Sequence, residues 1–271
     1  MNFYGFTPRT PLAKVYALRH APHKKKIPET PLRADFETMR LPFPTDRLDV
    51  PTLLRAYRMG VFPMASDRHA PTFAWYAGME HQGGLCRAHL PLDRLTISRS
   101  LVKTLRQKKF SVSINEDFEA VIRACADVPR RGQKGTWISE TLIDGYCTLF
   151  DAGIAHCVTC RDAQGALAGG LYGVQVGGVF CGESVVSLMP DAGKVALVHL
   201  VARLWRGGFD FLETQQVTPL TGAMGGVWID LPDYLDLLEA CRDNSRANFA
   251  LPGLSEAQIL EPYLAFRKKC Q

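Results

Sequence analysis

Two periodicities of apolar residues divide this 271-residue chain into predicted helices and strands. Apolar positions at helical spacing predict helices over 53–57, 100–109, 116–126, 140–150, 194–205 and 232–241. Short alternating or continuous apolar runs predict strands over 110–114, 154–161, 166–176, 179–183 and 209–214. Helices and strands therefore mix along the chain instead of forming separate blocks.

Local signals mark where several of these elements begin and end. Asn115 and Ser139 are N-cap residues that stand immediately before two predicted helices. Gly60 and Gly153 follow predicted helices, where glycine accepts the left-handed conformation that ends a helix. Residues 162–165 read Asp-Ala-Gln-Gly, a turn sequence that joins two strands into a hairpin. The order of elements predicts an α+β fold on a largely antiparallel sheet.

The chain divides into a basic extension of low order over residues 1–45, a small N-terminal domain over 46–95 and a larger domain over 96–271. Residues 1–33 contain seven Lys or Arg residues and one acidic residue. Such a segment is either a disordered tail or an electrostatic arm for a polyanion such as tRNA. The formal net charge of the whole chain is +5, a bias too mild to indicate a nucleic-acid partner by itself.

Composition predicts a cytoplasmic protein with no membrane partner. Apolar residues make up 46% of the chain and charged residues 22%, which allows a sizeable core in a soluble protein. No stretch reaches the roughly 18 uncharged apolar residues that span a bilayer, and the N-terminus has no secretory pattern. The scattered cysteines fit reduced thiols in the cytosol.

The sequence predicts neither a metal site nor a bound cofactor. Cys157 and Cys160 form a C-x-x-C pair, but no second Cys or His pair is suitably spaced for structural zinc. Residues three apart in a strand point to opposite faces, so the two thiols are expected to separate. Gly193 and Lys194 fail the Walker A pattern, and the Gly-rich stretch 168–178 lacks the dinucleotide-binding spacing. Any transferred group must therefore arrive already activated.

Four places along the chain carry candidate chemistry. Glu183 ends an apolar strand beside Gly and Ser, either facing solvent or holding a ligand's ammonium group. Glu213 and Gln215 are two apart on a predicted strand, so both are expected on one face. That pair is either a polar edge-strand face or a site that positions and deprotonates an amine. Trp75 and Trp137 are either core side chains or flat walls of a pocket.

Six segments, in order along the chain, match the pattern of one protein family. Residues 55–63 resemble A-Y-x-x-G-(I/V)-F-P, 75–76 resemble W-(W/Y), 97–100 resemble I-S-R-S, 135–138 resemble G-T-W-I, 170–174 resemble G-(M/L)-Y-G-V and 180–184 resemble F-C-G-E-S. These patterns are typical of the leucyl/phenylalanyl-tRNA–protein transferases. The resemblance covers about residues 48–240, and six ordered matches make it specific.

The resemblance implies a fold and an activity. The fold is α+β, with a small N-terminal domain followed by a GNAT-like (acetyltransferase-like) mixed-sheet domain. The activity is transfer of Leu or Phe, and less often Met, from aminoacyl-tRNA to proteins that begin with Lys or Arg. The products then become substrates for N-degron proteolysis. The partners are therefore aminoacyl-tRNA and acceptor proteins with a destabilising N-terminus, and no cofactor is needed.

The resemblance also implies roles for particular residues. The walls of the pocket for the aminoacyl group and terminal adenosine would be Trp75, Trp137, Leu171, Phe180 and Glu183. The surface that contacts the tRNA would include Arg99, Lys103, Arg106 and Lys194. The catalytic pair would be Glu213 and Gln215, matching a D-x-Q pattern in which the Gln oxygen accepts a hydrogen from the attacking amine and the carboxylate supports it.

The chain departs from the family pattern at several of these places. Glu213 stands where the family has Asp, and Leu220 stands where a His is common. Met64 and Gly193 replace other family residues. We infer a divergent member of this family. Two alternatives remain open: a non-catalytic module that binds tRNA or protein N-termini, and an acyl-CoA-dependent N-acetyltransferase, although that class's Q/R-x-x-G-x-G/A loop is missing.

Overall fold

The computed structural model describes residues 47–128 and 135–269, and an eight-stranded sheet lies at the centre of this part. The strand order is β10-β4-β9-β8-β7-β6-β5, with β3 paired to β4. The strands are β3 (Met79–His81), β4 (Gly84–Leu90), β5 (Ser111–Ile114), β6 (Ala155–Arg161), β7 (Leu167–Val176), β8 (Val179–Ser187), β9 (Phe211–Glu213) and β10 (Val227–Asp230). All described pairs in this sheet are antiparallel except β8 with β9, which confirms a mixed, largely antiparallel sheet.

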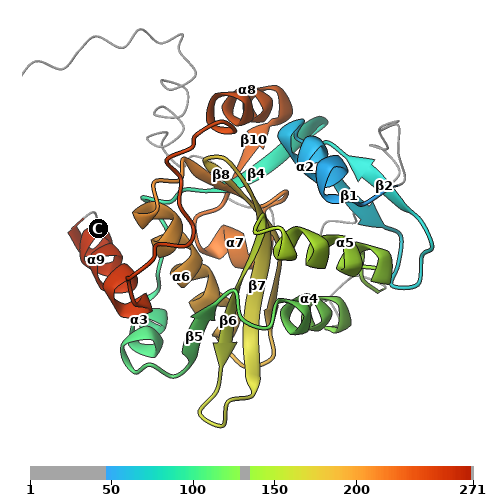
Figure 1. Cartoon of the computed structure of the whole chain (residues 1–271). Helices are drawn as coiled ribbons and strands as arrows, with labels where there is room; N and C mark the ends of the chain where they lie inside the picture. The colour runs from blue at the N-terminus through green and yellow to red at the C-terminus, as the bar shows by residue number, and fades with distance from the viewer. Residues whose placement is uncertain (1–46, 129–134, 270–271) are drawn as a thin grey trace, which may run out of the picture.

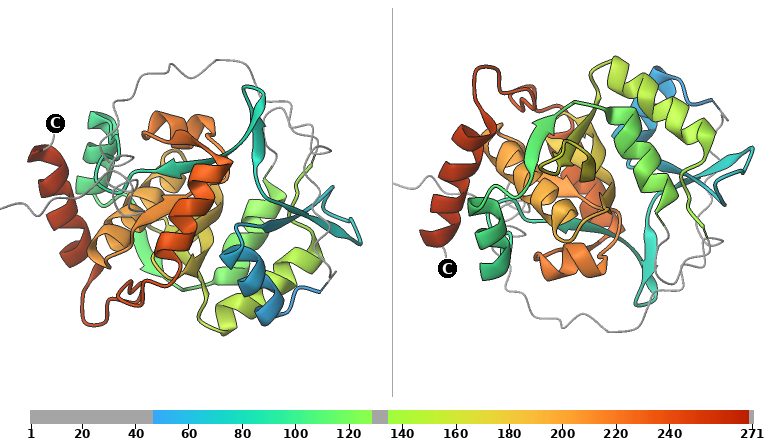
Figure 2. Two further views of the ribbon diagram at one scale, coloured as in Figure 1. Left: turned by 90° about the horizontal axis from the view of Figure 1, so that it is seen from above. Right: turned by 90° about the horizontal axis from the view of Figure 1, so that it is seen from below.

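Helices cover both faces of the sheet (Figures 1 and 2). One buried cluster involves α2 (Val50–Arg58), α4 (Phe118–Asp127), α5 (Glu140–Asp151), α8 (Leu231–Cys241) and the ribbon of β1 (Phe62–Ala65) and β2 (Phe73–Tyr76). The other involves α3 (Arg99–Arg106), α6 (Ala192–Arg206) and α9 (Glu256–Lys269). Successive strand residues alternate between the two clusters, so Leu171 belongs to one and Tyr172 to the other. Two cores thus enclose the sheet.

Several predicted boundaries are confirmed. Ser139 Oγ accepts a hydrogen bond from the Leu142 N–H at 3.4 Å and caps α5. Gly60 and Gly153 have φ values of 77° and 71°, in the left-handed region that ends α2 and α5. Cys157 and Cys160 lie in opposite cores, as strand geometry requires. The β6–β7 hairpin and β8 also lie where the sequence predicts them.

The prediction that Asn115 caps the following helix is wrong. Helix α4 begins at Phe118, and the residue before it is Asp117, with a φ of 53° and no side-chain cap bond. Asn115 instead continues the pairing of β5 with β6: its N–H donates to Cys157 O at 3.0 Å, and its Oδ1 accepts from Cys157 N at 3.1 Å. Asn115 therefore pairs with the partner strand instead of capping the helix.

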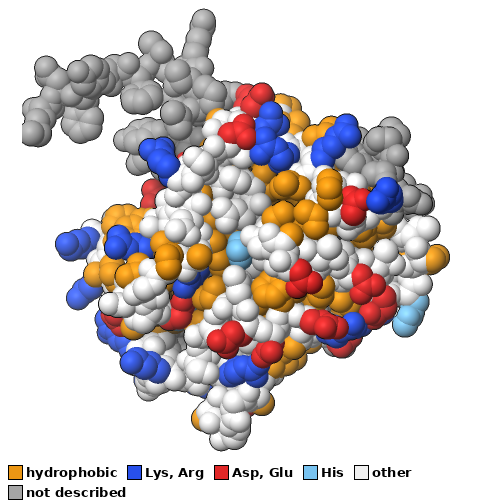
Figure 3. Space-filling view, in the orientation of Figure 1, with side chains coloured by type: hydrophobic (Ala, Val, Ile, Leu, Met, Phe, Trp, Pro, Cys, Tyr) orange, Lys and Arg blue, Asp and Glu red, His pale blue; other side chains and the backbone are white. Residues whose placement is uncertain are grey.

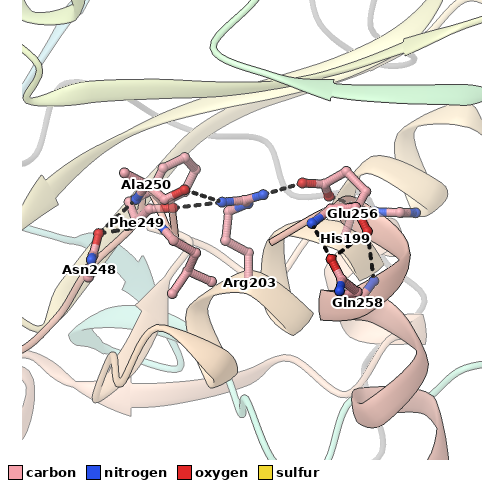
Figure 4. A network of polar contacts seen from close by, with 9 residues as sticks. His199, Arg203, Asn248, Phe249, Ala250, Glu256 and Gln258 are labelled. Carbon is pink, nitrogen blue, oxygen red and sulfur yellow. Dashed lines mark hydrogen bonds and ion pairs between the residues drawn. The ribbon is translucent and has the colours of Figure 1, made fainter. Parts of the chain in front are cut away.

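Sequence patterns missed the short strands β1–β4 and β10, the short helix α7 (Pro219–Ala223) and α9. Helix α9 buries Ile259, Leu260 and Tyr263 in the second core, and polar contacts also attach it to α6 (Figure 4). The buried Arg203 of α6 donates to Phe249 O at 2.8 Å and pairs with Glu256, while His199 Nδ1 lies 3.1 Å from the other Glu256 oxygen. Further along α9, the Tyr263 hydroxyl donates to Leu92 O at 2.8 Å.

Three other expectations concern the basic extension, membrane spans and metal ions. The basic extension over 1–45 lies outside the described residues. No helix within the described part of the chain is long and apolar enough to cross a membrane. Across the same residues, no group of three or more His, Cys, Asp or Glu side chains is placed to hold a metal ion.

Candidate functional site

A cavity of about 410 Å³ opens where β8 and β9 part. The two strands pair in parallel from Val179–Phe211 to Cys181–Glu213, after which β9 ends and β8 continues to Ser187. The wedge between them exposes side chains of β8 on one side and the segment after β9 on the other. The lining residues are Phe62, Met64, Met79, Trp137, Leu171, Tyr172, Gly182, Glu183, Ser184, Val185, Leu197, Leu200, Leu212, Thr214, Gln215, Gln216, Thr218, Pro219, Leu220 and Thr221.

Apolar side chains from several separate segments form the walls. Phe62 and Met64 come from β1, Leu171 from β7, and Leu197 from α6. The Trp137 carbonyl accepts a hydrogen bond from the Ala65 N–H at 3.1 Å, which ties the Trp137 segment to the end of β1. Such a cavity accepts an apolar side chain, with a few polar groups to orient it.

Glu183 is the acidic residue of β8 that lines this cavity. Its side chain is buried, and both carboxyl oxygens contact tyrosine hydroxyls: Oε1 lies 2.7 Å from Tyr57 and Oε2 3.0 Å from Tyr146. The two hydroxyl oxygens are themselves 2.7 Å apart. Burial raises the pKa of Glu183 to about 7, although the hydrogen bonds from the tyrosines act in the opposite direction. Thus α2, α5 and β8 each supply one member of a polar cluster.

Glu213 and Gln215 do not share a strand face, which corrects the sequence-based expectation. β9 ends at Glu213, and Gln215 has a φ of 53°, so the chain turns before the second residue is placed. Only Gln215 lines the cavity. Glu213 is fully buried behind it and accepts a hydrogen bond from the Gln215 N–H. Because the left-handed conformation is uncommon for residues other than glycine, this bond is a direct means of holding the turn.

Arg87 on β4 completes the support of Glu213. Its Nε lies 3.1 Å from Glu213 Oε1, and both side chains are almost fully buried. The guanidinium lies between the rings of Phe62 and Tyr234, 4.5 and 4.6 Å from their centres. Burial raises the pKa of the Glu213 carboxyl, and Arg87 offsets this only in part.

Sequence patterns missed Arg87, Tyr57 and Tyr146 as parts of the site. A charged residue inside the apolar stretch 86–90 was the available signal for Arg87, since a buried charge needs a partner. Both tyrosines fit the apolar faces of their helices, and nothing in the sequence distinguishes them from core residues.

The structure brings together four of the expected pocket residues, namely Trp137, Leu171, Glu183 and Gln215. The other two expected wall residues do not line this cavity. Trp75 packs edge-on against Phe73 within the β1–β2 ribbon. Phe180 lies in the same core as Leu171, but its ring stacks on Phe249, with ring centres 5.4 Å apart.

Basic side chains gather at the edge of the molecule formed by α3 and α9, which lie side by side (Figures 1–3). Arg99, Lys103 and Arg106 are exposed on α3. Lys268 and Lys269 are exposed at the end of α9, and we call these five residues the basic edge. Lys194 is placed differently: it stands in the first turn of α6 and pairs with Asp191 at 2.9 Å, so its charge is partly neutralised.

Comparison with known proteins gives consistent matches. The family model described as "Leucyl/phenylalanyl-tRNA protein transferase" matches residues 89–239, and the model for the N-terminal domain of the same proteins matches residues 46–77. The transferase of that name from Novosphingobium aromaticivorans is 47% identical over 186 residues, covering 69% of this chain and 68% of the relative. The one from Maricaulis maris is 46% identical, covering 69% and 82%. The one from Rubrobacter xylanophilus is 44% identical, covering 72% and 96%.

Proposed function

Since this chain belongs to the leucyl/phenylalanyl-tRNA–protein transferase family, we propose that it transfers an amino acid from aminoacyl-tRNA to the N-terminal amine of an acceptor protein. The observation that carries the proposal is the convergence of Trp137, Glu183 and Gln215 on one cavity. Leu or Phe, and less often Met, would be the transferred residue, because the walls are largely apolar. Acceptors beginning with Lys or Arg, and entry of the products into N-degron proteolysis in the cytoplasm, follow from the family resemblance.

The reaction needs orientation more than activation. The ester that joins the amino acid to tRNA is already reactive towards amines. The acceptor nitrogen attacks the ester carbonyl, the bond to the ribose oxygen breaks, the nitrogen loses a proton and the ribose oxygen gains one. Holding both reactants in one cavity removes much of the entropic barrier, and positional errors of about 1 Å can cost roughly 10²-fold. The attacking amine must also be neutral, and its unperturbed pKa is about 7.7–8.0.

Gln215 is suited to guide that amine. Its side chain reaches the cavity, and its carbonyl oxygen can accept a hydrogen from the attacking nitrogen. Glu213 does not line the cavity, and we assign it as a positioning residue that acts through the Gln215 N–H. The longer side chain of Glu213, compared with the Asp of the family pattern, is accommodated by its pairing with Arg87.

The basic edge is the surface that we assign to the tRNA backbone. Its five exposed cations come from two elements that adjoin each other. Phosphate contacts of this type give affinity that falls with rising salt. Lys194 would contribute less, because Asp191 already pairs with it.

We also propose the finer fold assignment. A parallel pair that diverges within a largely antiparallel sheet supports a GNAT-like domain over residues 96–271. The small N-terminal domain over 46–95 contributes β4 to the same sheet, so we propose that it folds together with the larger domain and not as a separate body. Trp75 and Phe180 would then support the pocket from behind.

A transfer assay tests the function. Several charged tRNAs are crossed with peptides of different N-termini, and labelled product is measured without ATP or acyl-CoA. We expect Gln215→Ala to lower transfer by roughly 10²-fold, because the amine loses its guide. Gln164→Ala, in the exposed β6–β7 turn, is the matched control and should be unaffected. Failure of the wild type with every donor and N-terminus would count against transfer and favour a non-catalytic binding module.

A further inference from the structure

Three side chains in the wall of the cavity form a closed ring of oxygen atoms. Tyr57 and Tyr146 contact each other at 2.7 Å, and each contacts a different carboxyl oxygen of Glu183, at 2.7 and 3.0 Å. All three distances are those of hydrogen bonds between oxygens. All three side chains are buried, so each contact is made within the protein interior.

Counting protons decides which form of Glu183 fits this ring. Each tyrosine hydroxyl carries one proton, so an ionised Glu183 leaves two protons for three contacts. One pair of oxygens would then face each other through lone pairs at hydrogen-bonding distance. A protonated Glu183 supplies the third proton. Its hydroxyl donates to one tyrosine, that tyrosine donates to the other, and the second tyrosine donates to the remaining carboxyl oxygen.

We propose that a three-proton ring with Tyr57 and Tyr146 holds Glu183 as a neutral carboxylic acid from acid pH up to about neutral pH. The cavity wall then presents a hydrogen-bonding group without a negative charge. This protonation state belongs to the protein before substrate binds.

The charged groups around the ring agree with this assignment. Arg87 on β4 and Glu213 on β9 face it as a pair, so the cation that would favour an ionised Glu183 is already matched by an anion. Cys181 on β8 and Tyr172 on β7 are the other titratable neighbours, and burial raises the pKa of Cys181 well above its usual range. Burial likewise raises the pKa of Glu183 to about 7.

The neutral form has a consequence that rests on the proposed function. Glu183 is the one carboxyl group among the residues that line the cavity. A carboxylate beside a bound amine favours the ammonium form, which has no lone pair for attack. A neutral Glu183 can still form a hydrogen bond with the amine or the ester but does not hold the amine protonated. The ring therefore keeps the cavity compatible with a nucleophilic amine up to about neutral pH.

Titration of Glu183 tests the proton assignment without any substrate. The side-chain carboxyl carbon is observed by NMR in protein with ¹³C-labelled glutamate, and Glu183→Gln identifies its resonance by loss. This variant is expected to fold, because an amide can donate to one tyrosine and accept from the other. We expect a midpoint near 7. A midpoint near the ordinary value of about 4.3 would overturn the proposal, whether or not the protein transfers amino acids.

The pH dependence of single-turnover transfer tests the consequence. The reactive form has a neutral amine and a neutral Glu183, so in the wild type we expect a bell-shaped pH profile with its maximum between the midpoint of Glu183 and the amine pKa of about 7.7–8.0. The falling limb should be absent in Glu183→Gln, whatever that variant's absolute rate. A falling limb that persists unchanged in the variant would show that Glu183 ionisation is not its cause. The absence of any transfer would refute the proposed function but leave the NMR result to judge the ring.

Discussion

At the scale of single residues, two buried carboxyl groups near the cavity have different surroundings. Glu183 lines the cavity and contacts the neutral hydroxyl groups of Tyr57 and Tyr146. Glu213 lies behind the cavity, where it contacts Arg87 and the backbone of Gln215. Glu183 is therefore suited to contact substrate. Glu213 is suited to hold Gln215, which lines the cavity, in place.

Removing the charge of Glu213 should destabilise the whole protein. Glu213→Gln leaves the buried Arg87 guanidinium without its anion, and breaking a buried pair costs roughly 3–5 kcal/mol. Urea unfolding of the variant should show a loss of this order. Glu239→Gln is the control, because the Glu239 side chain is 75% exposed and its pairing with Arg242 is long, at 3.7 Å. Equal stability of both variants would mean that another group neutralises the charge of the buried Arg87 guanidinium.

The ionisation of Glu183 should make stability fall as pH rises. Its folded pKa is raised from 4.5 to about 7, so the folded state binds the proton more tightly than the unfolded state does. The stabilisation is complete below pH 4.5 and is lost as pH rises through 7. Relative to Glu183→Gln, the wild type should lose on the order of 3 kcal/mol across this window. Urea unfolding at pH 5 and pH 8 measures it, and a constant difference would contradict it.

At the scale of elements, a few polar contacts help to attach α9 to α6. Arg203 reaches the Phe249 carbonyl and Glu256, and Glu256 also contacts His199 (Figure 4). Burial raises the pKa of the Glu256 carboxyl, but His199 and Arg203 outweigh this and lower it. A lowered folded pKa gives stability that is present at neutral pH and lost as pH falls. The attachment of α9 should therefore weaken in acid.

Glu256→Gln should loosen α9 without unfolding the protein. The variant leaves Arg203 with only backbone acceptors, so local opening of the helix becomes easier. Hydrogen exchange across Glu256–Lys269 should accelerate by at least about tenfold, which corresponds to roughly 1.4 kcal/mol. Glu261→Gln, exposed on the same helix, should leave exchange unchanged. Equal amide exchange rates in both variants would mean that apolar contacts alone hold α9 against the rest of the protein.

The basic edge should bind tRNA through phosphates. Replacing Lys103 and Arg106 by Ala should weaken binding for every tRNA to a similar degree. It should also reduce the slope of log affinity against log salt by about 1 for each phosphate that the variant no longer binds. Arg123→Ala on α4 is the control, because Arg123 is engaged by Glu119 and Glu140. Fluorescence titration at several salt concentrations measures the slope of log affinity against log salt for each variant. An unchanged slope in the Lys103 and Arg106 variant would mean that tRNA binds another surface.

At the scale of the whole molecule, the cavity exists because one pair of strands diverges. β8 and β9 share three paired positions and then separate, and side chains from both cores line the resulting wedge. Phe62 and Trp137 reach it from the N-terminal segment and a loop, while Leu197 reaches it from α6. No single element contains the site, so its geometry depends on how both cores pack against the sheet.

The sequence by itself determined the family, the mixed sheet, most helices and four cavity residues, because motif order and apolar periodicity are local properties of the chain. It did not determine the turn at Gln215, the Tyr57–Tyr146–Glu183 ring or the Arg87–Glu213 pair. These join residues as far apart as 126 positions, between Tyr57 and Glu183, and only packing brings them together. The strand predicted over 209–214 ends at Glu213, whose carboxylate accepts a hydrogen bond from the Gln215 N–H in the turn that follows. Periodicity indicates which side chains are buried, whereas tertiary structure decides which buried polar groups meet.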